Sequence, residues 1–403
     1  MRKLFVVSLL WPALALAGAW STPNPDARAM ALAQAGVAHQ AGPEAISMNP
    51  AGLAGPQGFA ITGSLQVIDN RTSWSDPALG SSSTVRHPAY PPLVAASYGG
   101  TLGNGMAWGA GVGFNALGGG SLYWPEGWPG QFHVETVNQQ VVMLRGGGAI
   151  QPLPWLKVGA AVSYYRASEE LSQAMSFGGQ VAQAQVGVAG GAPSWALSLE
   201  AAAPGLPLRF GADYRAKGEL TLKGKAHFSG VPAAFQAQLQ DQGASTKMIV
   251  PPELNLGLAW QATKHLEVLV GFTLEGWHVY KEDAFIGDKG FSVVVPRNYN
   301  DAQDYRLGVE YADDPALQGF SLRAGVFRSV SKQPTDTLSP SLSDASSWNV
   351  AAGAGFQVSK GMRIDASYQY AKFDEVTASG NTALAGTYKT SANLFSLGVN
   401  WRM

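Results

Sequence analysis

The 403-residue chain contains no cysteine, and only 14% of its residues are charged. The absence of cysteine excludes disulfides, thiolate metal sites and cysteine nucleophiles. The low charge accompanies 49 glycines, whereas soluble domains average about 25% charge and about 7% glycine. A formal net charge of −1 gives no electrostatic footprint for nucleic acid. We therefore expect no nucleic-acid partner. The six histidines lack metal-ligand spacing, so we expect no metal, and we expect no cofactor.

Long apolar runs are also missing, except at the start of the chain. Arg2 and Lys3 precede the apolar stretch Leu4–Leu16, and the small residues Ala17-Gly18-Ala19 follow it. This order is typical of a secretory signal, so residues 1–19 are expected to be removed. A single transmembrane anchor is the alternative, but the stretch is shorter than the roughly 20 residues that a bilayer requires. An exported chain without helical spans is periplasmic, secreted or an outer-membrane barrel.

Apolar and polar residues alternate over segments of about ten residues, the length of a tilted membrane-spanning strand. The alternating segments are 208–215, 254–261, 305–311, 348–357, 362–370 and 395–403. A soluble two-sheet sandwich also alternates. Here the polar set mixes glycine with charges of both signs, which suits a barrel lumen better than a surface, and aromatic residues at segment ends suit membrane girdles. We predict an all-β protein, with residues 57–403 forming a transmembrane antiparallel β-barrel of about 14 strands.

Residues 20–56 break this alternation. The alanine-rich stretch Ala27–Ala38 predicts a short helix capped by Asp26, and the segment closes with Asn49-Pro50-Ala51-Gly52-Leu53. The interior of a barrel of this size is either a channel or plugged. We therefore predict that residues 20–56 form a hatch in the lumen; a periplasmic tail is the alternative.

Four stretches stand out, in order along the chain: Ala27–Gly36 with Ser47–Leu53, Trp124–Phe132, Phe210–Gly224 and Val250–Leu254. These stretches resemble, in the same order, four features of the FadL family. The first resembles the family's plug with its Asn-Pro-Ala motif, and the second resembles its third extracellular loop. The third resembles a strand that reads Phe-Gly-X-Ser-Tyr-Arg, and the fourth resembles a strand that begins with Pro-Pro-Glu. This family comprises outer-membrane transporters of long-chain fatty acids and hydrocarbons and includes the TodX proteins. The chain departs from it at Met403, where an aromatic residue is usual, and at Pro129 and Gln131.

The resemblance implies a bacterial outer-membrane protein that is a monomer and not an enzyme, and that passes a fatty acid or another hydrophobic small molecule to outer-membrane lipid. It further implies capture by a groove in the outer loops, binding in the lumen and lateral release through a gap at a kinked strand. Two other functions remain open. A lipid hydrolase has only the pair His227 and Ser229, without a Gly-X-Ser-X-Gly turn, and a general porin leaves no place for a plug. The sequence does not distinguish fatty acids, alkanes and aromatic compounds.

An apolar loop is the predicted capture surface. Apolar burial contributes about 0.8 kcal/mol per CH₂, so aliphatic and aromatic side chains alone can hold a long tail. The predicted groove residues are Leu122, Tyr123, Trp124, Trp128, Phe132, Leu171 and Phe177. Anchoring of the loop in the membrane is the alternative.

Strand parity directs several cations into the lumen, where one of them could bind a carboxylate. The candidates are Lys157, Arg209, Arg306 and Arg323. Asp213 lies close to Arg209 in the sequence and Glu310 lies close to Arg306, so ion pairing is the simpler explanation for most of these cations.

Glycines interrupt the segment that by order forms the third strand. Gly109, Gly111 and Gly113 alternate there, and glycine inside a strand often marks a bulge or a close approach. We predict the lateral opening at these three residues; room for the plug is the alternative.

Overall fold

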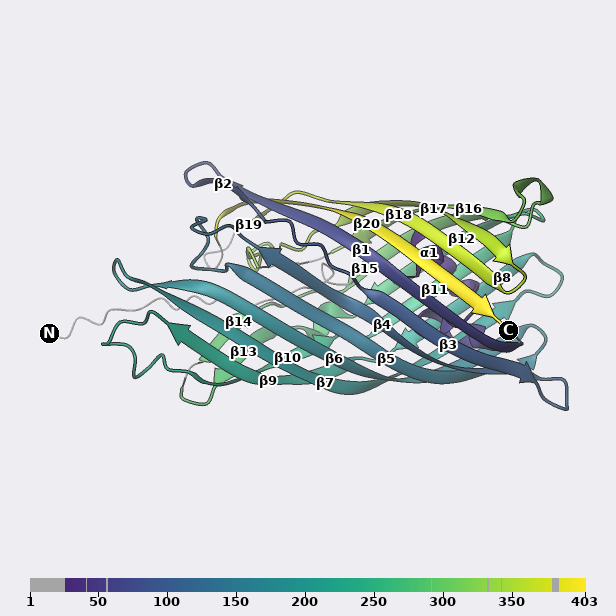
Figure 1. Cartoon of the computed structure of the whole chain (residues 1–403), viewed down its shortest axis with the longest axis horizontal. Coiled ribbons are helices and arrows are strands. Elements are labelled where there is room, and N and C mark those ends of the chain that lie inside the picture. Colours follow the sequence, from purple (N-terminus) through teal and green to yellow (C-terminus); the bar gives the residue numbers. More distant parts are fainter. Residues whose placement is uncertain are drawn as a thin grey trace.

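The computed structural model describes residues 26–40, 42–55, 57–290, 292–331, 333–341, 343–378 and 384–403. The predicted signal, residues 1–19, lies outside the described residues. Within them, the strands form a closed antiparallel barrel of 14 strands with a short N-terminal segment inside it (Figure 1). The predicted all-β barrel is therefore confirmed.

The strands are β1 (Gly58–Asp76), β2 (Gly80–Ser83), β3 (Pro92–Thr101), β4 (Ala107–Tyr123), β5 (Thr136–Leu153), β6 (Leu156–Ser176), β7 (Val181–Ala202), β8 (Leu208–Arg215), β9 (Gly218–Ser229), β10 (Gln242–Val250), β11 (Glu253–Gln261), β12 (Leu266–Glu275), β13 (Glu282–Gly287), β14 (Ser292–Pro296), β15 (Ala302–Tyr311), β16 (Phe320–Val330), β17 (Ser347–Ser359), β18 (Met362–Phe373), β19 (Val376–Ala378) and β20 (Gly386–Arg402). The helical elements are α1 (Ala27–Ala31), η1 (Gly36–Ala38), α2 (Ala45–Met48), η2 (Pro50–Leu53), η3 (Trp277–Val279) and η4 (Pro315–Leu317).

The barrel closes where β20 pairs with β1, from Ala60↔Arg402 to Ser75↔Thr387. Several barrel strands are interrupted, so that β8 and β9, β10 and β11, β12 and β13, and β14 and β15 each follow one another along one barrel strand. Pro251 and Pro252 separate β10 from β11, because proline cannot donate a ladder hydrogen bond. The short strands β2 and β19 extend the hairpins of β1 and β20.

The alternation of the sequence places apolar side chains outside and small or polar ones inside. In β20, Leu397 is 58% exposed on the outer surface, whereas its neighbour Ser396 is 5% exposed and faces the lumen. Among the described residues, no helix is long and apolar enough to cross a membrane.

The two ends of the barrel differ in their connections. β1 begins and β20 ends at the same end, where the β5–β6 and β17–β18 turns are only residues 154–155 and 360–361. The long connections, including 124–135, 230–241 and 331–346, lie at the opposite end. Outer-membrane barrels have short periplasmic turns and longer outer loops, so the long connections are extracellular.

The described part of the predicted hatch, residues 26–55, lies inside the barrel (Figure 1). Asp26 caps α1 as predicted, because its Oδ1 accepts a hydrogen bond of 2.7 Å from Ala29 N. The predicted helix over Ala27–Ala38 is too long, since α1 ends at Ala31. Ala33 and Gln34 follow with φ of 51° and 59°, a left-handed conformation that terminates an α-helix. The chain then forms η1, which lies against the inner face of β8, β11 and β12.

Lumen-facing glycines of the barrel provide the space that the hatch occupies. A Cβ atom on Gly211 would lie 2.4 Å from Val37 O, one on Gly308 would lie 2.7 Å from Leu32 O, and one on Gly159 would lie 2.5 Å from Ala51 N. Side chains at these positions would collide with hatch backbone. Packing a segment against the inner wall therefore requires glycine at these lumen-facing positions.

Overpacking this contact should loosen the hatch. In Gly257→Val, the new Cβ would lie 2.9 Å from both Ala38 N and Val37 Cβ, so we expect a loss of about 1–3 kcal/mol of unfolding free energy and a rise in conductance across planar bilayers. Gly146→Val is the control, since a Cβ there meets nothing within 4 Å. A Gly257→Val protein as silent as the parent would contradict the contact.

Candidate functional site

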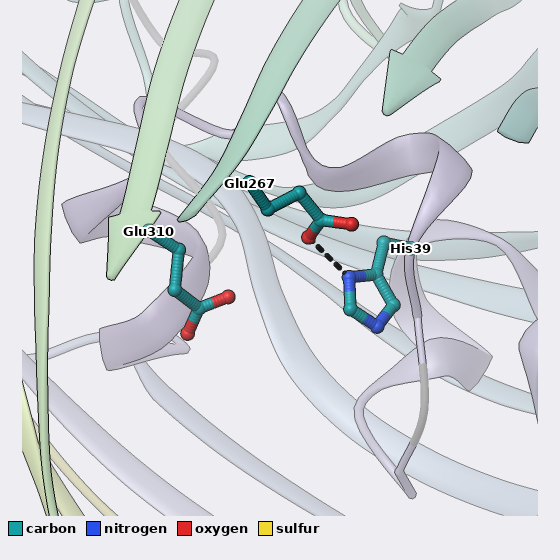
Figure 2. A group of neighbouring side chains, drawn as sticks. All are labelled: His39, Glu267 and Glu310. Carbon is teal, nitrogen blue, oxygen red and sulfur yellow. Dashed lines mark hydrogen bonds and ion pairs between the residues drawn. The ribbon is translucent and has the colours of Figure 1, made fainter. Parts of the chain in front are cut away.

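An ion-pair cluster fastens the hatch to the barrel wall. His39 Nδ1 of the hatch lies 2.5 Å from Glu267 Oε2, and Glu310 projects beside this pair (Figure 2). Arg28 Nη2 of the hatch donates to Glu310 at 2.6 Å. Glu267 and Glu310 face each other across β12 and β15, and two like charges in that position repel unless cations separate them.

The same three groups, His39, Glu267 and Glu310, could by distance share a metal ion. Both carboxylates, however, already have arginine partners: Glu267 pairs with Arg209, and Glu310 pairs with Arg28 and Arg323. A divalent cation would meet three guanidinium groups, which disfavours its binding. We therefore assign the cluster to hatch docking.

The Asn-Pro-Ala motif connects the hatch to β7. Asn49 is fully buried, and its Nδ2 donates to Val37 O at 2.8 Å and to Leu199 O at 3.1 Å. Ala51 N donates to Ser198 Oγ at 2.9 Å. Because each bond satisfies a buried polar group, the predicted hatch motif, Asn49, Pro50 and Ala51, acts as a docking motif.

A cavity lies above the hatch, on its extracellular side, and we call it the upper cavity. Gln34 of the hatch borders it, and the remainder of its lining comes from β1, β4, β12, β15 to β18, β20 and two connecting segments. Its lining residues are Gln34, Ile68, Asn70, Thr72, His87, Ala89, Gly119, Gly120, Ser121, Leu122, Glu275, Asp304, Arg306, Phe327, Ser329, Ser343, Asp344, Ala345, Ser347, Asn349, Gln369, Ala371, Phe373, Thr390, Ala392 and Leu394. The apolar members suit a hydrocarbon tail.

The charged lining of the upper cavity is mainly acidic. It consists of three carboxyl groups, on Glu275, Asp304 and Asp344, and one guanidinium, on Arg306. Arg306 is bound to Asp304 and lies over the Phe327 ring at 5.3 Å. In the part of the chain that the structure describes, the cavity therefore has no arginine or lysine free of an ion pair.

A second space, the lower cavity, lies between the hatch and the wall and shares Gln34, Glu275 and Arg306 with the upper one. Arg145 borders it and is 1% exposed. Its Nε donates to Ser163 Oγ at 2.9 Å and its Nη1 to Ile46 O of the hatch at 3.2 Å. Among the described residues, Arg145 has no carboxylate within ion-pair distance, and its Nη2 has no hydrogen-bond partner.

The strand ladder of the barrel wall is broken beside the upper cavity, and we call this break the wall opening. β4 pairs with β5 along its whole length, with a bulge between Ala116 and Gly118, but it pairs with β3 only as far as Leu93↔Asn115. Beyond that point the segment 84–91 follows β1 and reaches β4 only at its far end, where Val85 N donates to Tyr123 O at 2.7 Å. No ladder pair joins 116–122 to that segment in the described structure.

Two prolines explain why the ladder stops. Ala89 and Pro91 direct their backbone polar groups to β1, so the backbone nitrogens of residues 88, 90 and 92 face β4. Pro88 and Pro92 lack the N–H that a ladder with β4 needs. Residues from both edges, including Ala89 and Ser121, border the upper cavity. The upper cavity therefore lies against the stretch of wall in which the ladder is broken.

The predicted placement of the opening at Gly109, Gly111 and Gly113 is wrong. All three pair with both β3 and β5, and they face the hatch: a Cβ on Gly109 would lie 2.0 Å from Leu53 O, and one on Gly113 would lie 2.6 Å from Ile46 Cγ2. Room for the plug, the alternative reading, explains these glycines. The break in the ladder lies on the same strand, further toward the extracellular end.

The predicted capture residues lie mostly inside a packed core rather than along an open groove. Leu122, Trp124, Trp128 and Leu171 belong to one buried cluster, and Phe177 packs against it. The Trp124 and Trp128 rings stack at 4.1 Å. Trp124 Nε1 donates to Pro340 O at 3.2 Å, and Trp128 Nε1 donates to Val134 O at 2.8 Å. Only Leu122 of the set borders the upper cavity.

The remaining two capture candidates are more accessible. Tyr123 stacks against His87 at 4.2 Å, at the end of the wall opening, and Phe132 is 38% exposed. The pair considered for hydrolysis is not assembled with the cavities, since exposed His227 bonds to Asp241 at 2.6 Å.

Each predicted head-group cation has a carboxylate partner, although not always the one expected from the sequence. Lys157 binds Glu200 at 3.0 Å, and Arg323 binds Glu310 and Asp365 at 2.6 and 2.7 Å. Arg209 pairs with Glu267 instead of Asp213, and Arg306 with Asp304 instead of Glu310. Sequence reasoning missed Arg145, whose isolation depends on strand register and carries no local signal.

Residues 343–345, in the loop between β16 and β17, line the upper cavity, and Asp344 among them is a buried titratable group. Burial, together with the nearby Glu275 and Asp304 carboxylates, holds the pKa of Asp344 well above its ordinary value. The docked loop thus keeps a proton that the undocked loop would release. Docking is then favoured at low pH and weakens as the pH rises above the ordinary range of aspartate.

This dependence can be measured because the chain has no cysteine. A nitroxide attached to Thr335→Cys should become more mobile as the pH rises from about 5 to about 8, and Asp344→Asn should abolish the change. Equal mobility profiles in the two proteins would show that Asp344 does not control the loop.

Comparison with known proteins agrees with this architecture. The family model of the outer membrane protein transport proteins (OMPP1/FadL/TodX) matches residues 8–403. A comparison with curated protein sequences gives no match. A FadL homologue from Pseudomonas aeruginosa superimposes with a TM-score of 0.84 at 17% identity, covering 95% of this chain and 99% of the other.

Two toluene transporters share the fold. The Ralstonia pickettii transporter TbuX has a TM-score of 0.70 at 19% identity, covering 96% of this chain and 100% of its own. The Pseudomonas putida transporter TodX has a TM-score of 0.73 at 18% identity, covering 93% and 98%. Since the family match spans nearly the whole chain, this protein belongs to the FadL/TodX family of outer-membrane transport proteins for hydrophobic compounds.

Proposed function

We propose that this protein takes up hydrophobic compounds through its extracellular end, holds them in the upper cavity and releases them sideways into the outer membrane. The observation that carries the proposal is the wall opening at 116–122, whose two edges both border the cavity. A cavity that meets the lumen on one side and the break in the wall on the other would provide a route that bypasses the hatch.

The lateral direction follows from the energy of an apolar ligand. Exposure to water forfeits about 25 cal/mol per Å² of apolar surface, whereas passage into lipid retains that gain. The periplasmic route also requires displacement of the hatch, which the cluster of Arg28, His39, Glu267 and Glu310 fastens to the wall. Passage through the opening breaks none of these contacts.

The lining of the upper cavity disfavours a carboxylate head group. A buried anion needs a cation or several hydrogen-bond donors to replace its lost hydration. Arg306 is already bound to Asp304, and the remaining acidic lining residues, Glu275 and Asp344, supply no cation. We infer that the compounds carried are hydrophobic molecules without a carboxylate, the relatives for toluene being consistent with such cargo.

Filling the wall opening should stop release. Ala89 lies at one edge of the opening and borders the cavity, so Ala89→Trp should reduce the uptake of a labelled hydrophobic compound by intact cells to background. The affinity of the Ala89→Trp protein in nanodiscs for the same compound should change by less than about 0.5 kcal/mol, roughly a factor of two.

Ala96→Trp is the matched control, because Ala96 lies on β3 where the strand pairs with both neighbours, opposite Ile61 and Val112. This variant should take up the compound normally. Normal uptake by Ala89→Trp, with a folded barrel shown by heat-dependent gel mobility, would rule out the lateral route at this position.

Arg145 supports a second candidate, the carriage of fatty acids with the carboxylate in the lower cavity. Its buried Nη2 has no partner. We expect n-dodecanoate to bind at least about tenfold more weakly than n-dodecanol, about 1.4 kcal/mol, and Arg145→Gln to leave that ratio unchanged. Tighter binding of dodecanoate that is lost in Arg145→Gln would instead establish the fatty-acid function.

A further inference from the structure

Two buried carboxyl groups face the upper cavity without a cation. Glu275 is 7% exposed and Asp344 is 4% exposed. Glu275 accepts a hydrogen bond of 2.6 Å from Trp277 Nε1, and Asp344 accepts one from Ser331 Oγ. In the described part of the chain, neither has an arginine or lysine within ion-pair distance, whereas their neighbour Asp304 has Arg306.

An independent group points to the same kind of ligand. Gln369 borders the upper cavity and is 1% exposed. Its Nε2 donates to Asn349 Oδ1 at 3.2 Å, but its Oε1 has no hydrogen-bond partner. A buried acceptor without a donor costs about 1–3 kcal/mol, and a donor supplied by a ligand removes that cost.

We propose that the upper cavity selects amphiphiles whose polar end donates hydrogen bonds, and that it prefers an ammonium group to a hydroxyl group. Glu275 and Asp344 would bind the ammonium, and Gln369 would accept a further N–H. This inference rests on the proposed uptake function and specifies its substrate class.

The arrangement of the cavity gives such a ligand one orientation. Glu275 and Asp304 belong to β12 and β15, which lie across the barrel from β4 in the order of strand pairing. Apolar residues such as Leu122 and Ala89 lie on the side of the wall opening. An ammonium held by Glu275 and Asp344 therefore directs its alkyl tail toward the opening, the part that meets lipid first.

The preference for ammonium over hydroxyl follows from charge. Two buried carboxyl groups without a cation are stable only when they hold protons or meet a positive charge. A primary ammonium provides the charge and up to three donors, whereas a hydroxyl provides one donor and no charge. A carboxylate provides neither a positive charge nor a hydrogen-bond donor.

A series of ligands with the same n-dodecyl tail tests the inference on the full-length protein in nanodiscs. The affinity should fall in the order dodecylammonium, dodecanol, dodecanoate, with about tenfold between the first two. Dodecyltrimethylammonium has the charge but no donors, so it should bind more weakly than dodecylammonium. Equal affinity of these two cations would overturn the role of hydrogen-bond donation.

The variants Glu275→Gln and Asp344→Asn retain the side-chain shape but remove the charge. Each should lower the affinity for dodecylammonium by about tenfold and change that for dodecanol by less than about twofold. Glu169→Gln is the matched control, because Glu169 is a buried carboxyl, 4% exposed, on β6 and does not border the upper cavity. An equal effect of Glu169→Gln would show that the total charge, and not this site, attracts the cation.

Gln369→Leu is a second test that does not alter charge. This variant should bind both dodecylammonium and dodecanol more weakly. If dodecanol binds and is taken up but dodecylammonium binds no better in any variant, the proposed uptake stands and the head-group preference is wrong. If none of the dodecyl compounds binds to the folded barrel, the proposed function itself fails.

Discussion

The packing of the hatch against the inner wall determines how the rest of the molecule can work. A barrel of this size encloses more space than its own side chains fill, and here backbone from residues 26–55 lies directly against lumen-facing glycines such as Gly211 and Gly308. Close packing is combined with the ion pair of Arg28 with Glu310 and the hydrogen bond of His39 with Glu267. With the hatch held in this way, the upper cavity lies on its extracellular side, and the proposed route leaves through the wall without displacing the hatch.

The sequence was informative wherever the determining interaction is local or periodic. Alternation predicted the barrel, because the period of two reports directly which face of a strand meets lipid. The capping of α1 by Asp26 was also predictable, since cap and helix are neighbours in the chain. The end of α1 was not, because Ala33 and Gln34 adopt left-handed conformations where distant glycines of β15 and β16 bring the wall against the hatch.

The candidate site shows the same division. A lateral opening on β4 stays a prediction. The break in the β3–β4 ladder could not be located from the sequence, because it follows from Pro88 and Pro92 on the neighbouring segment rather than from glycines on β4 itself. The burial of Trp124 depends on Pro340 in another loop. Ion-pair partners depend on register between strands, and for that reason Arg209 binds Glu267 rather than the nearby Asp213. Contacts of this kind leave no trace in a local pattern.

In the proposed route, the polar end of the ligand affects the rate of release from the cavity more than its alkyl tail does. An alkyl tail that moves from the upper cavity into lipid exchanges one apolar environment for another, so its burial contributes little to the barrier for leaving. The contacts of the head group with Glu275, Asp344 and Gln369 have no equivalent among lipid chains and must be broken before release. Transport requires binding strong enough to capture the compound and weak enough to let it go. In the proposed mechanism, the wall opening would set where the ligand leaves, and the acidic side of the cavity would set how long it stays.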